Sequence, residues 1–165
     1  MDEEQFEQLY LASRSRLVGQ LYAMTGNLAE AQDCVQEAFV RAWPRRRSID
    51  TDGAPEAWLR TTAWRLSVSR WRRAATGLRA HRRHGVAPDL PEPGVEHIDL
   101  ARALRTLNPD QRRAIVLHYL CDLSVDQVSA ETGAPPSTVK SRLHRGRAAL
   151  AAALTPETHL EAHRG

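Results

Sequence analysis

The stretch LSVDQVSAETGAPPSTVKSRLHRGRAAL, residues 123–150, predicts two short helices joined by a tight turn. Ser124 fits the N-cap of the first helix, and Gln127, three residues later, fits its reciprocal capping partner. Gly133 fits the end of that helix, because a left-handed backbone conformation costs glycine little. The two prolines that follow suit the start of a new helix, where no backbone donor is needed. The stretch therefore predicts a helix–turn–helix arrangement.

The second of these helices, expected at about residues 137–150, begins with polar and basic side chains. Val139, Leu143 and Leu150 recur near one face and predict its buried side. The side chains that suit phosphates and base edges are Ser137, Thr138, Lys140, Ser141, Arg142, His144 and Arg145. An arginine-rich helix is often only solvated surface, and paired helices are a common packing unit. Here the cap, the turn and the basic helix start occur in the order found in DNA-binding helix–turn–helix motifs, whose second helix enters the major groove.

Charge is distributed unevenly along the chain, although the net charge is only +3. Residues 1–43 contain seven acidic residues and three arginines, whereas residues 44–84 contain eleven arginines and three acidic residues. A polyanion is the expected partner of the basic segment, and a protein is the expected partner of the acidic one. No stretch has the length of a membrane span, and the acidic start does not resemble a signal peptide. We therefore expect a cytoplasmic protein without membrane insertion.

The apolar spacing predicts an all-α chain of two small helical domains, since no alternating strand pattern of useful length occurs. The first domain, residues 1–75, is expected to contain three helices and a basic loop at residues 44–55. Residues 76–98 are rich in glycine and proline and predict a flexible linker. The second domain, residues 99–154, is expected to contain four helices, including the helix–turn–helix. A loosely ordered tail is expected at residues 155–165.

Two faces of the first domain are candidate binding surfaces. One is a stripe at i, i+3, i+4 and i+7 spacing on the second helix, and it consists of Asp33, Gln36, Glu37 and Val40. Taken alone, this stripe is more simply solvated surface. The third helix interleaves arginines with Trp58, Trp64 and Trp71, a composition typical of surfaces that stack single-stranded bases. Packing against a neighbouring helix is the alternative, and it is the favoured interpretation for Trp58.

Little in the sequence favours catalysis, a metal or a cofactor. Cys34 and Cys121 lie far apart without a zinc or redox spacing, so buried, reduced thiols are expected. The pattern HLEAH near the C-terminus is only a weak metal-binding spacing. No nucleophile or phosphate-binding loop is apparent, and we expect a protein that is not an enzyme.

Three segments of the chain, in this order, resemble the bacterial extracytoplasmic-function (ECF) sigma factors of the sigma-70 family. They are GNLAEAQDCVQEAFVRAW, APEAWLRTTAWRLSVSRWRR and LSVDQVSAETGAPPSTVKSRLHRGRAAL. The resemblance covers nearly the whole chain and implies the two domains called regions 2 and 4. It implies a sigma factor that is monomeric when free, directs core RNA polymerase to promoters and is regulated by an anti-sigma factor.

The resemblance also assigns roles by position. The stripe on the second helix would dock on the clamp helices of the polymerase β′ subunit, and the second domain would meet the β flap. The recognition helix would read the −35 duplex through Ser137, Thr138, Lys140, Ser141, Arg142 and Arg145. Capture of a flipped base from the melted −10 strand would fall to the loop and the third helix. The implied −10 residues are Arg45, Arg46, Arg47, Ile49, Asp50, Thr51, Arg60, Trp64, Arg65, Ser69, Arg72 and Arg73.

Two other functions fit parts of the sequence. A stand-alone helix-turn-helix regulator would share residues 123–150, but it would not need the Asp33 stripe or the tryptophan-bearing helix. A sigma-mimicking protein that binds an anti-sigma factor would have no need for a basic DNA surface. The eleven arginines of residues 44–84 argue against that mimic.

Overall fold

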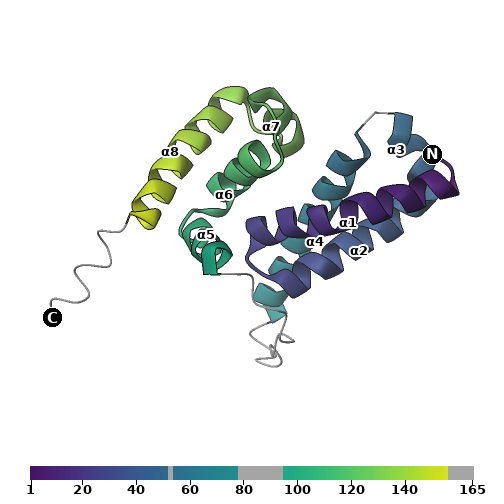
Figure 1. The fold of residues 1–165 in the computed structure, drawn as a ribbon, viewed down its shortest axis with the longest axis horizontal. Coiled ribbons are helices and arrows are strands. Elements are labelled where there is room, and N and C mark those ends of the chain that lie inside the picture. Colours follow the sequence, from purple (N-terminus) through teal and green to yellow (C-terminus); the bar gives the residue numbers. More distant parts are fainter. Residues whose placement is uncertain (52–53, 78–94, 156–165) are drawn as a thin grey trace. The chain divides into compact units, whose positions relative to one another are not determined.

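The computed structural model describes residues 1–51, 54–77 and 95–155, and it divides the chain into two compact units (Figure 1). Unit 1 is Met1–Pro91 and unit 2 is Glu92–Gly165. The described part of the chain contains helices and no strand, which confirms the all-α prediction. Most of the expected linker and all but the first residue of the expected tail lie outside the described residues. Among the described helices, none has the length and apolar character needed to cross a membrane.

Unit 1 is built on three long helices, α1 (Glu3–Thr25), α2 (Leu28–Ala42) and α4 (Pro55–Gly77). The boundary between α1 and α2 follows the local sequence. Gly26 ends α1 in the left-handed region with φ of 74°, a conformation that favours glycine. Asn27 then caps α2, because its side chain accepts a 3.0 Å hydrogen bond from the Glu30 amide. This tight turn lets α1 and α2 run alongside each other.

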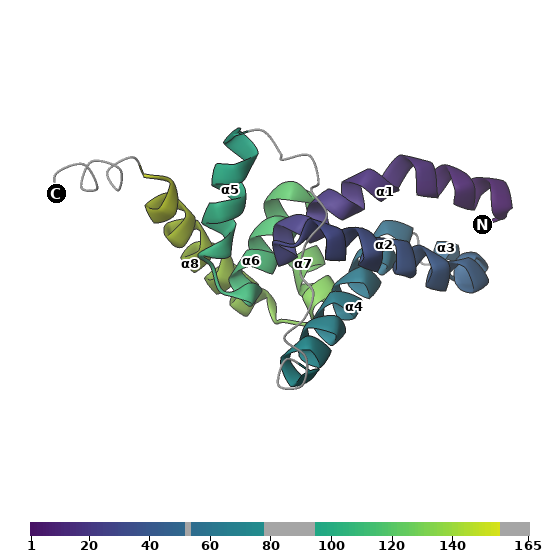
Figure 2. The same cartoon turned by 90° about the horizontal axis from the view of Figure 1, so that it is seen from below.

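The core of unit 1 lies where α2 packs against both α1 and α4 (Figure 2). Leu21 of α1, Val35 of α2 and Leu59 of α4 are each about 1% exposed. Burying each of these side chains stabilises the unit by about 1.5–3 kcal/mol. The apolar face of α2 therefore holds the helix in place, while its opposite face remains available to partners.

The expected loop after α2 is helical, and the prediction of an irregular segment over residues 44–51 was wrong. A 3₁₀ helix, η1 (Trp43–Arg45), leads into a short helix, α3 (Arg46–Thr51). Pro44 occupies the first turn of η1, where its missing N–H leaves no bond unmade. Ile49 contributes a buried side chain. The proline that predicted a helix end thus starts the next helical segment.

The buried face of α4 is rotated relative to the predicted one. The sequence predicts Trp58, Leu59, Ala63 and Leu66 on the inner side. The observed buried residues are Leu59, Arg60, Ala63 and Ser67. Trp58 and Leu66 are only half-buried and face a groove described below. The side of α4 that carries Trp58 and Leu66 therefore lines a groove and is not part of the core.

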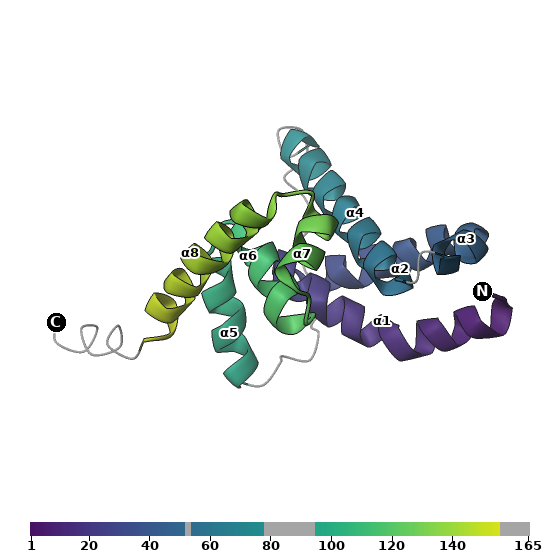
Figure 3. The ribbon, with the colours of Figure 1, turned by 90° about the horizontal axis from the view of Figure 1, so that it is seen from above.

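Unit 2 contains α5 (Val95–Arg105), α6 (Pro109–Ile115), the π-helical segment η2 (Val116–Leu120), α7 (Val125–Thr132) and α8 (Pro136–Leu154). The capping box of Ser124 and Gln127 is present, with bonds of 2.8 and 3.1 Å. Gly133 ends α7 with φ of 76°. Figure 3 shows α7 and α8 joined by the short turn that follows. The predicted helix–turn–helix is confirmed.

Close packing of α8 on α6 holds the recognition helix in unit 2. Val139 and Leu143 are buried, as predicted, and Gly146 lies one turn further along the same face. A Cβ atom built on Gly146 would lie 2.7 Å from Cγ1 of Ile115. The two helices therefore approach so closely at this point that only glycine fits without a shift.

Candidate nucleic-acid and polymerase surfaces

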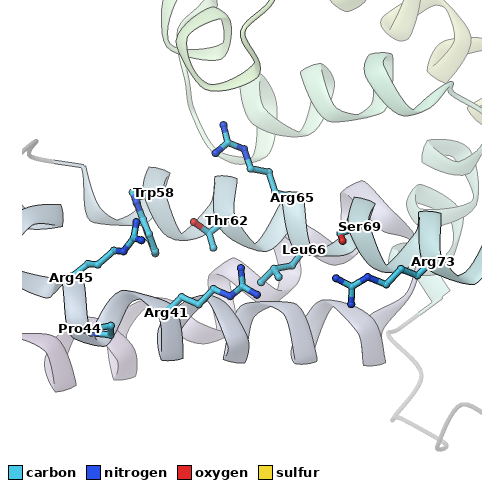
Figure 4. Close-up of a pocket in the computed structure, with 9 residues that line it drawn as sticks. All are labelled: Arg41, Pro44, Arg45, Trp58, Thr62, Arg65, Leu66, Ser69 and Arg73. Atoms are coloured by element: carbon cyan, nitrogen blue, oxygen red, sulfur yellow. The ribbon is translucent and has the colours of Figure 1, made fainter.

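A basic groove lies between α2 and α4 in unit 1, with a volume of about 550 Å³ (Figure 4). The described residues that line it are Arg41, Pro44, Arg45, Trp58, Thr62, Arg65, Leu66, Ser69 and Arg73. Four of these nine residues are arginines and none is acidic. Like charges gathered in a concave surface focus their field and attract a polyanion. We call this site the basic groove.

Helical spacing explains how α4 supplies one wall of the basic groove. Trp58, Thr62, Arg65, Ser69 and Arg73 follow one another at steps of three or four residues, which places them along one side of the helix. Figure 4 shows the guanidinium groups of the Arg41 and Arg73 side chains extending over the groove from α2 and α4. The groove thus combines cations with the indole of Trp58 and the apolar side chains of Pro44 and Leu66.

Four of the predicted −10 residues come together in the basic groove: Arg45, Arg65, Ser69 and Arg73. Sequence reasoning missed Arg41, Pro44, Thr62 and Leu66 as groove residues, and it favoured packing for Trp58. The four-residue and three-residue steps along α4 were a signal for Thr62 and Trp58. No local signal pointed to Arg41, because it reaches the groove from another helix.

A second hollow adjoins the basic groove on the outer side of α4. Its described lining residues are Trp64, Arg65, Val68, Ser69, Arg72 and Arg73. Three of these also line the basic groove, so the two hollows form one basic surface along α4. Trp71 lies outside both and is 70% exposed. An aromatic side chain between arginines is the composition that stacks bases in single-strand binding proteins.

Other predicted −10 residues are placed differently. Arg60 is only 6% exposed, and its Nη1 donates to Oε1 of Gln20 at 3.3 Å inside unit 1. The assignment of Arg60 to a DNA surface was therefore wrong, because tertiary packing turns this side chain inward. Ile49 is also buried, which removes its side chain from the DNA-facing set. Asp50 and Thr51 belong to α3, but their side chains lie outside the described part of the structure.

Arg46 and Arg47 extend the positive charge beyond the groove. The guanidinium carbon of Arg46 lies 4.1 Å from the ring centroid of Trp43, a cation–π stacking arrangement. Its Nη1 also donates to the Trp43 carbonyl at 2.8 Å. Arg47 is exposed. Arg46 is thus held against the protein, while Arg47 faces solvent.

The stripe predicted for a protein partner is exposed on α2. Val40 is 57% exposed, and the side chain of Asp33 is 73% exposed. Two stripe acids pair with arginines: Asp33 with Arg70 at 3.8 Å and Glu37 with Arg41 at 3.0 Å. Both pairs are exposed and exchange readily with other partners. We call these four residues, Asp33, Gln36, Glu37 and Val40, the acidic stripe.

An apolar groove borders the acidic stripe between α1 and α2. Its described lining residues are Glu3, Phe6, Glu7, Tyr10, Gln36, Phe39, Val40 and Trp43. Edge-to-face contacts hold its aromatic rings, with centroids 5.2 Å apart for Phe6 and Trp43. The stripe and this groove together form a surface with both acidic and apolar groups, which suits a protein partner.

The recognition helix α8 presents its predicted DNA-facing residues at its start. Lys140 and Arg145 are exposed, as are both serines of the predicted set, Ser137 and Ser141. Thr138 is half-buried. Arg142 is held at 3.6 Å from a carboxylate oxygen of Asp110 on α6, with 28% of its side chain exposed. Four of the six side chains are therefore exposed at the surface of α8, and Arg142 is the one that pairs with an acid of unit 2 in the described structure.

Neither cysteine forms a disulfide in the described part of the structure. Cys34 is buried, Cys121 is half-buried, and both are free thiols. Burial raises the pKa of the Cys34 thiol, which keeps it protonated and poorly reactive. Within the described ranges, His, Cys, Asp and Glu side chains form no cluster of three that would hold a metal ion.

The fold and these surfaces define a class of protein. A helix-turn-helix in unit 2 fits duplex DNA, and a basic, aromatic groove in unit 1 fits a nucleic-acid strand. An acidic and apolar face beside the groove fits a protein partner. These features together define a DNA-binding transcription factor that also contacts a protein.

Comparison with known proteins identifies the family. The sigma-70 region 2 family matches residues 9–76, and the sigma-70 region 4 family matches residues 97–150. The chain is 30% identical to the ECF RNA polymerase sigma factor SigW of Bacillus subtilis, and the match covers 90% of this chain and 88% of SigW. It is 33% identical to the ECF RNA polymerase sigma factor SigJ of Mycobacterium tuberculosis, covering 92% of this chain and 51% of SigJ. The chain belongs to the ECF sigma factors of the sigma-70 family, which direct RNA polymerase to promoters.

Two solved structures are similar to this fold. One is the sigma factor RpoE in complex with the anti-sigma factor NepR from Bartonella quintana, with a TM-score of 0.77 and 26% identity over 92% of this chain and 97% of that one. The other is CnrH in complex with the cytosolic domain of CnrY, with a TM-score of 0.69 and 26% identity over 93% of this chain and 89% of that one. Both agree with the resemblance stated from the sequence.

Proposed function

We propose that the two DNA-binding surfaces of this sigma factor divide promoter recognition between them. The basic groove and the adjoining hollow of α4 hold the melted non-template strand of the −10 element, and α8 reads the −35 duplex. The observation that carries the proposal is the groove of about 550 Å³, which is lined by four arginines and the indole of Trp58 and has no acidic residue among its described lining residues. Such a site offers cations to phosphates and an aromatic face to an unstacked base.

The acidic stripe and its apolar border supply the contact with core RNA polymerase in this proposal. Exposed acids beside exposed apolar side chains fit a partner helix that carries both kinds of groups. The clamp helices of the β′ subunit are the expected partner, and the β flap is the expected partner of unit 2. Electrostatic complementarity of this kind mainly sets orientation and association rate.

The remaining expectations follow from this function. An initiation factor of this kind needs no catalytic group, metal or cofactor of its own, and it works where the chromosome is, in the cytoplasm. We expect the free chain to be monomeric. Because RpoE and CnrH were each solved with an anti-sigma partner, we also expect an anti-sigma factor to regulate this chain.

Removing the two stripe carboxylates tests the polymerase contact. The double substitution Asp33→Ala and Glu37→Ala is expected to weaken binding to core polymerase by about tenfold or more, because the charged partner groups lose their counterparts. Competition with the native chain for purified core polymerase measures this change. The affinity of the full chain for duplex DNA serves as the control and should not fall. Unchanged affinity for core polymerase would exclude the acidic stripe as the interface.

Replacing Arg142 tests how the recognition helix reads DNA. We expect Arg142→Ala to reduce the binding free energy for the preferred −35 duplex by about 1–3 kcal/mol, with a smaller loss on duplexes changed at the contacted base pair. Binding to a panel of single-base variants of the preferred duplex measures the difference. An equal loss on every duplex would place Arg142 on a phosphate instead.

A further inference from the structure

Arg41 connects two surfaces of unit 1. Its side chain extends from α2 over the basic groove, on the wall opposite α4 (Figure 4). Its Nε atom donates to Oε1 of Glu37 at 3.0 Å, across one turn of α2. Glu37 belongs to the acidic stripe. One ion pair therefore joins the groove assigned to DNA to the stripe assigned to polymerase.

We infer that Arg41 is a further contact for the melted strand, and that Glu37 partly cancels its charge while the sigma factor is free. This inference rests on the proposed function of the basic groove and the acidic stripe. When polymerase cations engage Glu37, the full charge of Arg41 becomes available to a phosphate. The sequence resemblance assigned no role to Arg41.

The geometry of the ion pair supports this role. Glu37 occupies the Nε donor of Arg41, which leaves the two terminal nitrogens of the guanidinium for phosphate oxygens. The Arg41 side chain is 56% exposed and that of Glu37 is 39% exposed. An ion pair this exposed is weak, and its partners change without a large cost. Glu37 therefore lowers the positive potential of the groove without locking Arg41 away from it.

The other arginine pair of the stripe does not reach the groove. Asp33 pairs with Arg70 at 3.8 Å, and Arg70 is not among the residues that line the groove. Among the described residues, the pair of Glu37 and Arg41 is thus the one that links stripe to groove. Linkage makes this effect reciprocal, so a bound strand also raises the affinity of Glu37 for its polymerase partner.

Binding of the full-length chain to a fluorescein-labelled single-stranded oligonucleotide, measured by fluorescence anisotropy at low salt, tests the inference. Glu37→Gln is expected to raise the affinity of the free chain for the oligonucleotide about threefold. The substitution removes the negative charge that pairs with Arg41, and an exposed ion pair contributes about this much free energy. The salt dependence of binding should steepen by about 0.7 in the logarithmic slope if Arg41 gains one phosphate. At saturating core polymerase, the native and Glu37→Gln chains should bind the strand equally.

Two comparisons separate this mechanism from a general change in charge. Glu30→Gln removes the same charge from α2. Neither Glu30 nor Glu37 lines the groove, but Glu37 pairs with Arg41 and Glu30 pairs with no groove arginine in the described contacts. Glu30→Gln should change strand affinity by less than about 1.5-fold. Arg41→Gln should lower affinity more in the Glu37→Gln chain than in the native chain, which is a non-additive pair in a double-mutant cycle.

Each outcome tests either the inference about Arg41 or the proposed function on which that inference rests. Equal gains from Glu37→Gln and Glu30→Gln, or additive effects of Glu37→Gln and Arg41→Gln, would overturn the inference and leave the groove as a strand site. A persistent threefold difference at saturating polymerase would also overturn it. A loss of strand binding in Arg73→Glu that the exposed Arg102→Glu variant of unit 2 does not share supports the groove as the strand site, and an unchanged affinity in Arg73→Glu would refute the proposed function instead.

Discussion

Charge reversal at Arg65 and Arg73 is expected to remove most single-strand binding by this sigma factor. Both arginines lie in the basic groove, and both also line the hollow beside it. Each reversal replaces an attractive phosphate contact by a repulsive one, which costs about tenfold in affinity, so the double variant Arg65→Glu and Arg73→Glu should lose about a hundredfold. Anisotropy with the single-stranded oligonucleotide at low salt measures the loss, and the salt dependence should become shallower.

A matched reversal separates the groove from the net charge of the chain. Arg102 of α5 is exposed and lies in unit 2, so Arg102→Glu changes the total charge as much as Arg73→Glu alone. We expect about tenfold weaker strand binding for Arg73→Glu and less than twofold for Arg102→Glu. Equal losses in these two single variants would mean that overall charge, and not the groove, holds the strand.

The largest effect on stability is expected at Gly146. A side chain there meets Cγ1 of Ile115 at 2.7 Å and Cδ2 of Leu107 at 3.2 Å, and both neighbours are buried, so neither moves away easily. Overpacking of this kind costs about 1–3 kcal/mol, and valine adds further methyl groups. We expect Gly146→Val to lower the free energy of unfolding of unit 2 by about 3 kcal/mol. Amide exchange of α6 and α8 in the full chain, followed against urea concentration, measures this change.

Gly19 provides the control for Gly146. It lies in the interior of α1, and a Cβ atom there meets no described atom within 4 Å. Gly19→Val should therefore leave the free energy of unfolding unchanged within about 0.5 kcal/mol, since valine is at least as good a helix former as glycine. A similar loss of stability in both variants would mean that glycine is required for helix geometry and not for the approach of α6 to α8.

Local signals explain what could be predicted from the sequence. The cap at Ser124 and the left-handed Gly133 depend on neighbours within a few residues, and the buried side of α8 at Val139 follows the helical spacing of its own segment; all are confirmed. The acidic stripe is exposed, as expected from its spacing on α2. Its role and the DNA contacts of individual side chains stay predictions, because they depend on groups that the polymerase and the DNA supply.

Tertiary packing explains what could not be predicted. Arg60 looks like a surface residue in sequence, but Gln20, forty residues away, accepts its hydrogen bond in the interior. Trp58 and Leu66 fit the inner stripe by spacing, yet a small rotation of α4 turns them to the groove. Arg41 joins the groove only because α2 packs against α4. Each of these placements depends on a helix that is distant in sequence. The periodicity of one segment gives no information about how it packs against such a helix.

Transcription in vitro tests the central claim most directly. Purified core polymerase, genomic DNA fragments and this chain are combined, and the 5′ ends of the transcripts are mapped. The account predicts starts at a distinct set of promoters that share −35 and −10 sequences, present with the native chain and lost with the double variant Arg65→Glu and Arg73→Glu. The same starts at the same level with and without the chain would contradict it.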